Sequence, residues 1–302
     1  MMTFKQLEAL YWIARLGSFA AAAARLHTTQ SAVSKRVQEL ESEFDTQLFD
    51  RGQRHARLTD KGEEMVAIAE KLLKQRDTAI EQFGRPDVLQ RRFRVGVTEL
   101  TALTWLPKLV AAIQLHYPKV TLEPDVDMSM KLRDKLLADE VDLIVVPDGV
   151  LDSRFAHESL GTVENAWMCK PGLVPTRKVL RVHELARLPL LTQGDRSGTG
   201  VNYMRWFHSL GVQPESTISS NSLIALLGLT VSGLGVSYLP RSCMEPMLKN
   251  GLLSVVRTNP PLPSIRYVAM YKRDVQSPLT ASIIMLAQEC CDFTRMFQTP
   301  QQ

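Results

Sequence analysis

The chain has 302 residues, too many for one small hydrophobic core, so we expect two or three domains. Hydrophobic residues make up 45% and charged residues 23% of the sequence, which is ordinary for a soluble globular protein. The formal net charge of +4 does not by itself imply nucleic acid, because the placement of charge matters more than its sum.

The four cysteines favour a reducing compartment. Cys169, Cys243, Cys290 and Cys291 form no C-x-x-C pair, and a disulfide framework is not expected at this density. Packing roles are favoured over a redox pair at the adjacent Cys290 and Cys291. The N-terminus shows no signal peptide, and no apolar stretch reaches the roughly 18–20 residues of a membrane span. We therefore expect a cytoplasmic protein with no membrane partner.

The first 83 residues predict four helices, each preceded by a hydroxyl residue that can cap it. Thr3 is expected to cap the first helix, which turns Phe4, Leu7, Leu10, Tyr11 and Ala14 inward. The other predicted caps and helices are Ser18 before 19–26, Thr29 before a helix to about Phe44, and Thr59 before 60–83.

The third of these helices has two unlike faces. Val33, Val37 and Leu40 form an apolar stripe suited to packing. The polar face carries amide, hydroxyl and ammonium groups, on Gln30, Ser31, Ser34, Lys35 and Gln38. Glutamine pairs with adenine edges and serine with several bases, while Lys35 and Arg36 are placed to meet phosphates. A short helix, a tight turn and such a second helix predict a helix-turn-helix that reads the major groove.

The helix predicted over 60–83 has a second apolar stripe, at Met65, Ile68, Leu72, Ala79 and Phe83. This stripe suits pairing with a second copy of the chain. The alternative is that the helix packs on its own domain. We favour self-pairing, because a helix between two globular parts has little core to lie against.

From residue 93 the periodicity changes to alternating strands and helices. A β-α-β-α-β order over 93–149 predicts an open parallel sheet covered by helices, and a second pass of strands and helices follows to about 297. The predicted fold class is therefore α+β multidomain, with a helical N-terminal domain, a linker helix and two α/β lobes.

A long ordered motif identifies the family. Residues 18–62 resemble the winged helix-turn-helix domain of LysR-type transcriptional regulators, in their small-residue helix and in the following matches: Gln30–Ser34, Leu40–Glu41, Leu48–Phe49, Arg51, Arg54, Leu58–Thr59 and Gly62. Ala56 and Lys61 depart from the family pattern, and both are expected to loosen the packing of the wing.

The resemblance implies roles and domains. Gln30, Ser31, Ser34 and Lys35 would contact DNA, Arg51 would support a backbone contact, and the wing residue Arg54 would enter the minor groove. The implied domains are a DNA-binding domain (1–58), a dimerising linker and hinge (59–92) and a periplasmic-binding-protein-like effector domain (93–302). Its lobe I would span about 93–161 plus 268–302, and its lobe II about 162–267. Homodimers through the linker, and homotetramers, are expected.

An effector is expected in the cleft between the lobes, because open α/β sheets bind ligands beyond the carboxyl ends of their strands. The candidate effector residues follow strands or precede helices: Thr98, Glu99, Thr101, Pro147, Asp148, Gln193, Gly194, Asn221 and Ser222. For each of them, local helix capping is an equal alternative. The family resemblance favours a small organic anion as effector. Glu99 would oppose a carboxylate ligand unless Arg133 or Arg196 compensated it.

No constellation predicts an enzyme, a metal site or a cofactor. The six histidines show no H-x-x-x-H or H-E-x-x-H spacing, and no G-x-S-x-G elbow or phosphate-binding loop is present. Two alternatives remain at this stage. One is a small-molecule receptor without DNA function, which would need a signal peptide in place of residues 1–58. The other is an enzyme on the same lobes, for which Glu99, Asp148 and Asp195 are the candidates.

Overall fold

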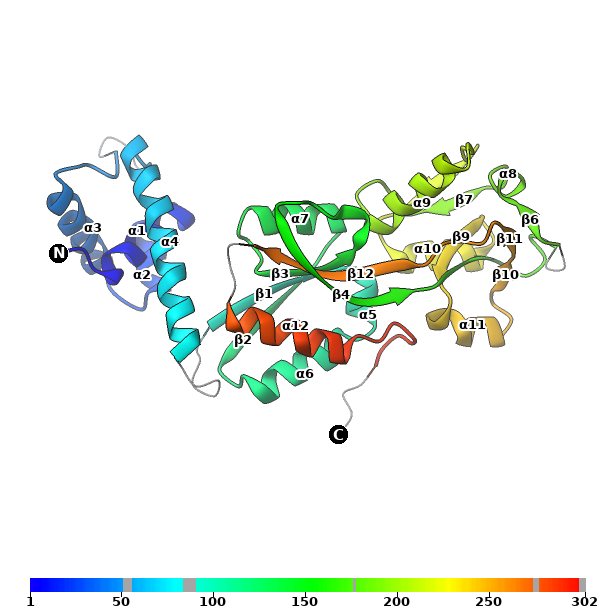
Figure 1. Ribbon diagram of the computed structural model, residues 1–302. Coiled ribbons are helices and arrows are strands. Elements are labelled where there is room, and N and C mark those ends of the chain that lie inside the picture. Colours follow the sequence, from blue (N-terminus) through cyan, green and yellow to red (C-terminus); the bar gives the residue numbers. More distant parts are fainter. Residues whose placement is uncertain (51–55, 84–90, 176–177, 274–276, 299–302) are drawn as a thin grey trace. The chain divides into compact units, whose positions relative to one another are not determined.

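The computed structural model describes residues 1–50, 56–83, 91–175, 178–273 and 277–298. The chain forms two compact units, Met1–Gly84 and Arg85–Gln302, which we name the N-terminal unit and the C-terminal unit (Figure 1). The N-terminal unit is helical and the C-terminal unit contains two mixed sheets, so the predicted fold class is confirmed.

Four helices build the N-terminal unit: α1 (Phe4–Leu16), α2 (Phe19–Arg25), α3 (Gln30–Phe44) and α4 (Asp60–Phe83). Each begins after its predicted cap. The hydroxyl oxygens of Thr3, Ser18, Thr29 and Thr59 accept hydrogen bonds from N–H groups of the first turns, at 3.4, 3.4, 3.2 and 3.0 Å. The local prediction of helix starts is therefore confirmed.

The core of the N-terminal unit is made by the apolar faces of α1 and α3. Leu10, Ile13, Val33 and Leu40 are fully buried. Phe4, which the sequence predicted to point inward, is 47% exposed, so that detail was wrong.

Helix α4 has a core to lie against, contrary to the reasoning from sequence. Ala69 is fully buried and Leu73 is 8% exposed, and both belong to the cluster formed by α1, α2 and α3. Of the predicted pairing seam, Met65 and Leu72 also pack against this cluster. Ile68 and Phe83 of the same seam are 50% and 89% exposed. Helix α4 thus completes the N-terminal unit, and only part of its predicted seam remains at the surface.

The C-terminal unit contains two lobes, each built on a five-stranded sheet. Lobe I has the order β2-β1-β3-β12-β4, with β1, β2 and β3 parallel and β12 antiparallel to β3 and β4. Its strands are β1 (Arg91–Val97), β2 (Val120–Val126), β3 (Leu143–Pro147), β4 (Phe155–Val163) and β12 (Ile265–Lys272). Its longer helices are α6 (Leu106–His116), α7 (Ser129–Leu137) and α12 (Pro278–Cys290).

Lobe II has the strand order β10-β5-β9-β7-β8. Its strands are β5 (Asn165–Cys169), β7 (Leu190–Thr192), β8 (Thr217–Ser219), β9 (Val236–Pro240) and β10 (Ser254–Val256). Its longer helices are α9 (Gly198–Ser209) and α10 (Leu223–Ser232). Smaller elements are β6 (Leu180–Arg181), α8 (Val182–Leu185), α11 (Glu245–Lys249) and β11 (Thr258–Asn259). The chain enters lobe II between β4 and β5 and returns to lobe I at β12.

The sequence missed two features of lobe I. The one helix expected between the first two strands of the β-α-β order is divided into α5 (Glu99–Leu103) and α6, because Pro107 lacks an N–H and its ring would clash with the carbonyl four residues before it, so it fits only the first turn of a helix. Strand β4 was not predicted, because its solvent face is polar and its burial is confined to a few positions. The last helix ends at Cys290, shorter than expected.

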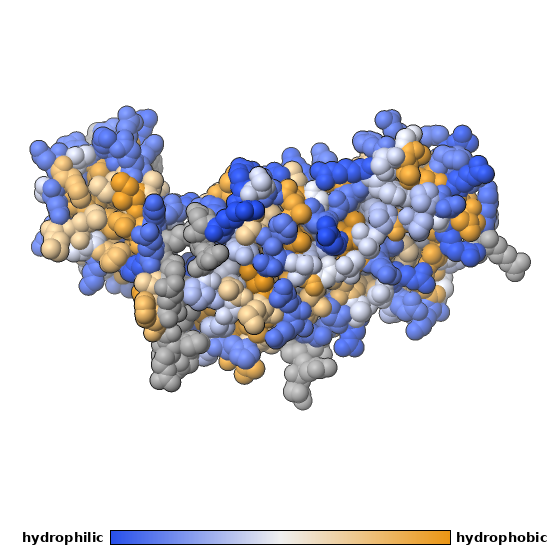
Figure 2. Space-filling model, viewed as in Figure 1, coloured by the Kyte–Doolittle hydropathy of each residue, from blue (hydrophilic) through white to orange (hydrophobic). Residues whose placement is uncertain are grey.

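One large cluster of buried residues joins the two lobes. It includes Trp105 and Phe293 from lobe I and Trp167, Tyr203 and Phe207 from lobe II. On the face of the C-terminal unit that Figure 2 shows, hydrophobic residues form scattered areas between hydrophilic ones, as is normal for a folded domain. No described helix is long and apolar enough to cross a membrane.

Candidate DNA interface and effector cleft

The polar face of α3 is held outward by the burial of its opposite face. Val33 and Leu40 are fully buried, whereas Gln30, Ser31 and Lys35 are exposed. The hydroxyl of Ser31 lies 3.0 Å from that of the cap Thr29. The amide of Gln30 and the ammonium of Lys35 have no hydrogen-bond or ion-pair partner among the described residues. The face therefore offers unpaired donors and acceptors.

Arg36 and Ser34 occupy the flanks of this face and are half-buried. Successive helical residues are rotated by about 100°, so Lys35 and Arg36 point in different directions and do not form one cationic patch. Their predicted phosphate contacts would therefore lie on different sides of α3.

A buried carboxylate ties the wing to α3. Oε1 of Glu41 accepts hydrogen bonds from the N–H groups of Leu48 (2.7 Å) and Phe49 (3.2 Å). Phe49 in turn forms an antiparallel bridge with Leu58, which makes the base of a two-stranded wing. Glu41 belongs to the family motif found in the sequence, and its contacts give that motif a structural reason.

Gly62 is required where α4 passes the start of the wing. A Cβ atom at this position would lie 2.1 Å from the carbonyl oxygen of Leu48. Of the two departures from the family pattern, Ala56 packs on the core cluster and Lys61 forms an exposed ion pair with Glu64 at 2.7 Å. Neither residue disturbs the described part of the wing, so the expected loosening is not seen there. The predicted wing contacts Arg51 and Arg54 lie outside the described residues.

Seven of the nine candidate effector residues fall into two groups. One group, Thr98, Glu99, Thr101 and Ser222 with Gln193 nearby, lies where β1, β7 and α10 meet. Thr101 is fully buried, and its hydroxyl lies 3.5 Å from that of Thr98. Thr98 and Thr199 both contact the hydroxyl of Tyr267, whose pKa burial raises to about 12.

Ser222 is the N-cap of α10. Its hydroxyl oxygen accepts from the N–H of Ala225 at 3.2 Å, so the local capping alternative applies to this residue. The same hydroxyl also donates to Oε1 of Glu99 at 3.0 Å, and the N–H of Leu223 donates to Oε2 at 2.5 Å. Glu99 comes from lobe I and α10 from lobe II, so this carboxylate bridges the lobes.

The second group lies around the end of β3. Pro147 is buried and packs beside Gly198, at the start of α9. Asp148 accepts from the Asn202 amide and from Nε of Arg266, each at 2.9 Å. These contacts already satisfy the Asp148 carboxylate. The remaining two candidates, Gly194 and Asn221, are neighbours: a Cβ at Gly194 would lie 3.3 Å from Oδ1 of Asn221.

A small cavity of about 20 Å³ marks the closed cleft. Its lining is apolar, amide and hydroxyl in character: Leu100, Val163, Asn165, Gln193, Thr199, Leu223, Tyr238, Pro240 and Tyr267. Only Gln193 among these was predicted. The others belong to strands or helices, and the sequence gives no sign that their side chains face a cleft.

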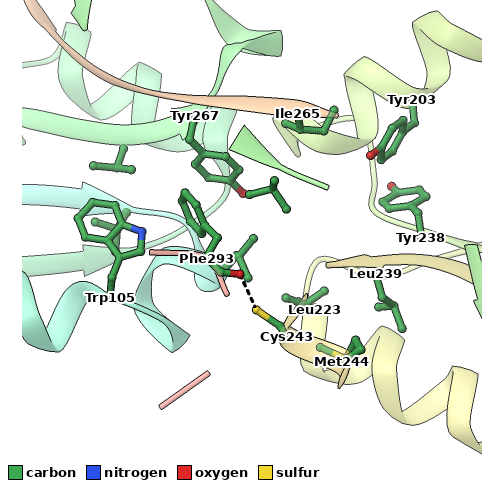
Figure 3. Packing of buried hydrophobic residues seen from close by; sticks show 14 of the residues in the cluster. Trp105, Tyr203, Leu223, Tyr238, Leu239, Cys243, Met244, Ile265, Tyr267 and Phe293 are labelled. Atoms are coloured by element: carbon green, nitrogen blue, oxygen red, sulfur yellow. Dashed lines mark hydrogen bonds between the residues drawn. The ribbon is translucent and has the colours of Figure 1, made fainter. Parts of the chain in front are cut away.

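Three tyrosines line or flank this cavity. Figure 3 shows the hydroxyl oxygens of Tyr203 and Tyr238 turned toward each other, with Tyr267 on β12. The rings of Tyr203 and Tyr238 lie 4.5 Å apart, and burial raises the pKa of both phenols. The phenols are therefore neutral at physiological pH.

A larger hollow, of about 670 Å³, has a different set of lining residues. It is lined by Arg241, Ser242, Glu245, Pro246, Lys249, Asn250, Thr294 and Arg295, all of which are exposed. None of the predicted effector residues lines it. The cleft, where strand ends and polar groups converge, is the better candidate site.

The four cysteines are free thiols. The thiol of Cys243 donates to the carbonyl of Phe293 at 3.2 Å, and burial raises its pKa to about 11 (Figure 3). Burial also raises the pKa of Cys290, and that of Cys291 to about 12. No group of three or more metal-ligating side chains occurs among the described residues.

Comparison with known proteins agrees with this architecture. Residues 4–63 match the model of the bacterial regulatory helix-turn-helix protein, lysR family, and residues 86–291 match the LysR substrate binding domain. A helix-turn-helix module followed by a two-lobed binding domain defines a class of ligand-responsive transcriptional regulators. The chain belongs to the LysR family of these regulators.

Relatives and solved structures cover nearly the whole chain. The regulator MetR of Escherichia coli is 27% identical over 298 residues, which is 97% of this chain and 92% of MetR. A full-length OxyR variant from Pseudomonas aeruginosa has a TM-score of 0.70 at 23% identity and covers 100% of this chain and 99% of its own. LysG from Corynebacterium glutamicum, solved with bound effector Arg, has a TM-score of 0.60 at 22% identity and covers 96% and 98%. These relatives are regulators and not enzymes, so the enzyme alternative and the receptor without DNA function are not favoured.

Proposed function

We propose that the regulator reads its operator with the exposed face of α3. Gln30, Ser31 and Ser34 contact base edges in the major groove, and Lys35 and Arg36 contact phosphates on either side. Arg54 enters the minor groove from the wing, and Arg51 supports a backbone contact. The observation that carries this proposal is the amide of Gln30 and the ammonium of Lys35, which have no partner in the described part of the chain, on a helix whose other face is buried.

The exposed part of the predicted seam on α4 supports a homodimer. On the predicted seam Ile68 and Phe83 are 50% and 89% exposed, whereas Met65 and Leu72 pack against the core of the N-terminal unit. Pairing two copies of α4 would remove Ile68 and Phe83 from water and place two α3 helices on one two-fold-related operator. A homotetramer would add contacts through the lobes.

The cleft of the C-terminal unit holds the small-molecule effector in this proposal, with Thr98, Glu99, Thr101, Gln193, Gly194, Asn221 and Ser222 around it and Pro147 and Asp148 beside it. Effector binding controls DNA binding only if its affinity differs between two arrangements of the lobes. The contacts that join the lobes, such as Glu99 with α10, are the ones such a change would alter.

The DNA roles are tested with duplexes selected from a random pool by the full-length protein. Wild type, Gln30→Ala and Lys35→Ala are then compared on the selected and a scrambled duplex at several salt concentrations. Gln30→Ala should lower the preference for the selected duplex roughly 10-fold, because a bidentate base contact contributes about 1–3 kcal/mol of discrimination. Lys35→Ala should weaken both duplexes alike and reduce the salt slope by about 1.

Lys71→Ala, which removes an exposed lysine from α4, is the matched control and should leave both duplexes unchanged. Selected sequences related by a two-fold axis would support the dimer. Equal losses for Gln30→Ala and Lys35→Ala, with preference unchanged, would contradict the assigned roles. A pool that yields no enriched sequence would contradict the DNA function.

A further inference from the structure

The carboxylate of Glu99 occupies the N-terminus of α10. It accepts the hydroxyl of the cap Ser222 and the first helical N–H, that of Leu223, at 3.0 and 2.5 Å. Helix N-termini are natural sites for a ligand carboxylate, because their N–H groups are unpaired and the helix dipole favours negative charge. In this protein the chain's own carboxylate, from the other lobe, fills that position.

The cavity beside this contact is too small for an effector. Leu100, next to Glu99, and Leu223, bonded to Glu99, both line it. Its volume of about 20 Å³ is enough for roughly one water molecule. An effector must therefore part the lobes to enter, and the bridge from Glu99 to α10 lies at the entrance it opens.

The charges around Glu99 determine which kind of ligand can take the place of its contact with α10. No residue that lines the cavity is charged, and Glu99 has no cationic partner among the described residues. The two arginines that the sequence offered as compensation do not contact it: Arg133 pairs with Asp134 at 3.1 Å, and the side chain of Arg196 is exposed. An anionic effector would displace one carboxylate and then face it across a cleft without positive charge, which is unfavourable at short range.

A cationic group meets the opposite situation. A parted cleft exposes the Glu99 carboxylate together with the rings of Tyr238 and Tyr267, which attract cations through their faces. Oε1 of Gln193 adds a neutral acceptor, now held by the hydroxyl of Ser197 at 2.8 Å. These groups together favour a positively charged nitrogen.

We infer that the effector carries an ammonium group and that Glu99 exchanges α10 for this group when the effector binds. The inference rests on the proposed effector role of the cleft and replaces the organic anion that the family resemblance favoured. Glu99 is then both the bridge between the lobes in the empty protein and the residue that selects the charge of the ligand.

The test is a thermal-shift screen of the full-length protein against three sets of metabolites of matched size: amines, carboxylates without an amine, and neutral compounds. A ligand that binds only the folded protein raises the unfolding midpoint. Hits should come from the amines. Glu99→Gln, which keeps the size and one acceptor oxygen, should raise the Kd of each amine roughly 10- to 100-fold, the range expected for a hydrogen-bonded charged pair.

Glu158→Gln is the matched control, because it removes an exposed carboxylate from β4 without touching the cleft. It should leave every Kd unchanged. Hits confined to carboxylates or neutral compounds would overturn the inference while leaving the cleft as the effector site. Amine hits whose Kd is unaffected by Glu99→Gln would also overturn it. If no set stabilises the protein, the proposed effector role of the cleft itself fails.

Discussion

Each of the two units contains a glutamate that accepts hydrogen bonds from the backbone. Glu41 accepts two N–H groups, and Glu99 accepts one N–H group and a hydroxyl. The two glutamates differ in how far along the chain their partners lie. Glu41 bonds to Leu48 and Phe49, seven and eight residues along the chain, within one small domain. Glu99 bonds to Leu223, 124 residues along the chain and in the other lobe. The first contact holds the wing on the helix of the proposed DNA interface, and the second joins the two lobes that part in the proposed effector mechanism.

The polar groups of the two sites differ in the same way. On α3 the amide of Gln30 and the ammonium of Lys35 have no partner among the described residues, so they are available to a ligand at once. In the cleft the carboxylates of Glu99 and Asp148 are already hydrogen-bonded within the protein. The proposed DNA interface is thus preformed, whereas the proposed effector site is closed on itself. Three tests, in order of decreasing effect, examine how far this difference holds.

The largest effect is expected at Gly62. Gly62→Ala would place Cβ 2.1 Å from the carbonyl oxygen of Leu48, so the start of the wing or of α4 must move. We expect the N-terminal unit to lose about 3 kcal/mol of stability, near the upper end for an overpacked site. Hydrogen exchange read by mass spectrometry should show faster exchange in residues 1–83 and no change in the C-terminal unit.

Gly228 in α10 is the matched control in the other unit. A Cβ there meets nothing within 4 Å, so Gly228→Ala should stabilise the C-terminal unit by roughly 0.5–1 kcal/mol through helix propensity. Faster exchange in both units after Gly62→Ala would show that the units do not fold independently, and the comparison would lose its basis.

The next effect is expected at Glu41. Glu41→Ala leaves the buried N–H groups of Leu48 and Phe49 without this acceptor, which should lower the stability of the N-terminal unit by about 2–3 kcal/mol. The displaced wing should also weaken binding to selected and scrambled duplexes alike. Glu41→Gln keeps an acceptor oxygen and should have the smaller effect in denaturant titrations. Equal losses for the two variants would refute the role of these hydrogen bonds.

The same contrast explains what sequence could predict. The helices and caps of the N-terminal unit, and which face of α3 is exposed, follow from patterns within about 60 residues, so hydroxyl caps and the stripe of Val33, Val37 and Leu40 were sufficient. The packing of α4 was misjudged because Ala69 and Leu73 form a second stripe that sequence alone does not assign to a partner.

The cleft was predictable only where a strand or helix ends. Glu99, Gln193 and Ser222 were proposed in this way, and the structure places Glu99 and Ser222 in contact. Tyr238 and Tyr267 were not proposed, because they lie within strands in which most residues are buried. Which face of a fully buried strand meets a cleft depends on contacts between distant segments, and these are absent from local periodicity.

The smallest effect is expected when a hydroxyl cap is removed from a helix, and it can be compared at one cap in each unit. Thr29→Ala removes the acceptor for the N–H of Ala32 at the start of α3, and Ser222→Ala removes that for Ala225 at the start of α10. Each should lower the stability of its own unit by about 1 kcal/mol, measured by hydrogen exchange.

The effects of the two substitutions on DNA binding should differ, because the first turn of α3 carries Gln30 and Ser31. Thr29→Ala should weaken binding to the selected duplex, whereas Ser222→Ala, tested without effector, should leave it within twofold. A DNA-binding defect in Ser222→Ala as large as that in Thr29→Ala would mean that the contact between Glu99 and α10 affects DNA binding even without effector. The two sites would then be coupled before any ligand binds.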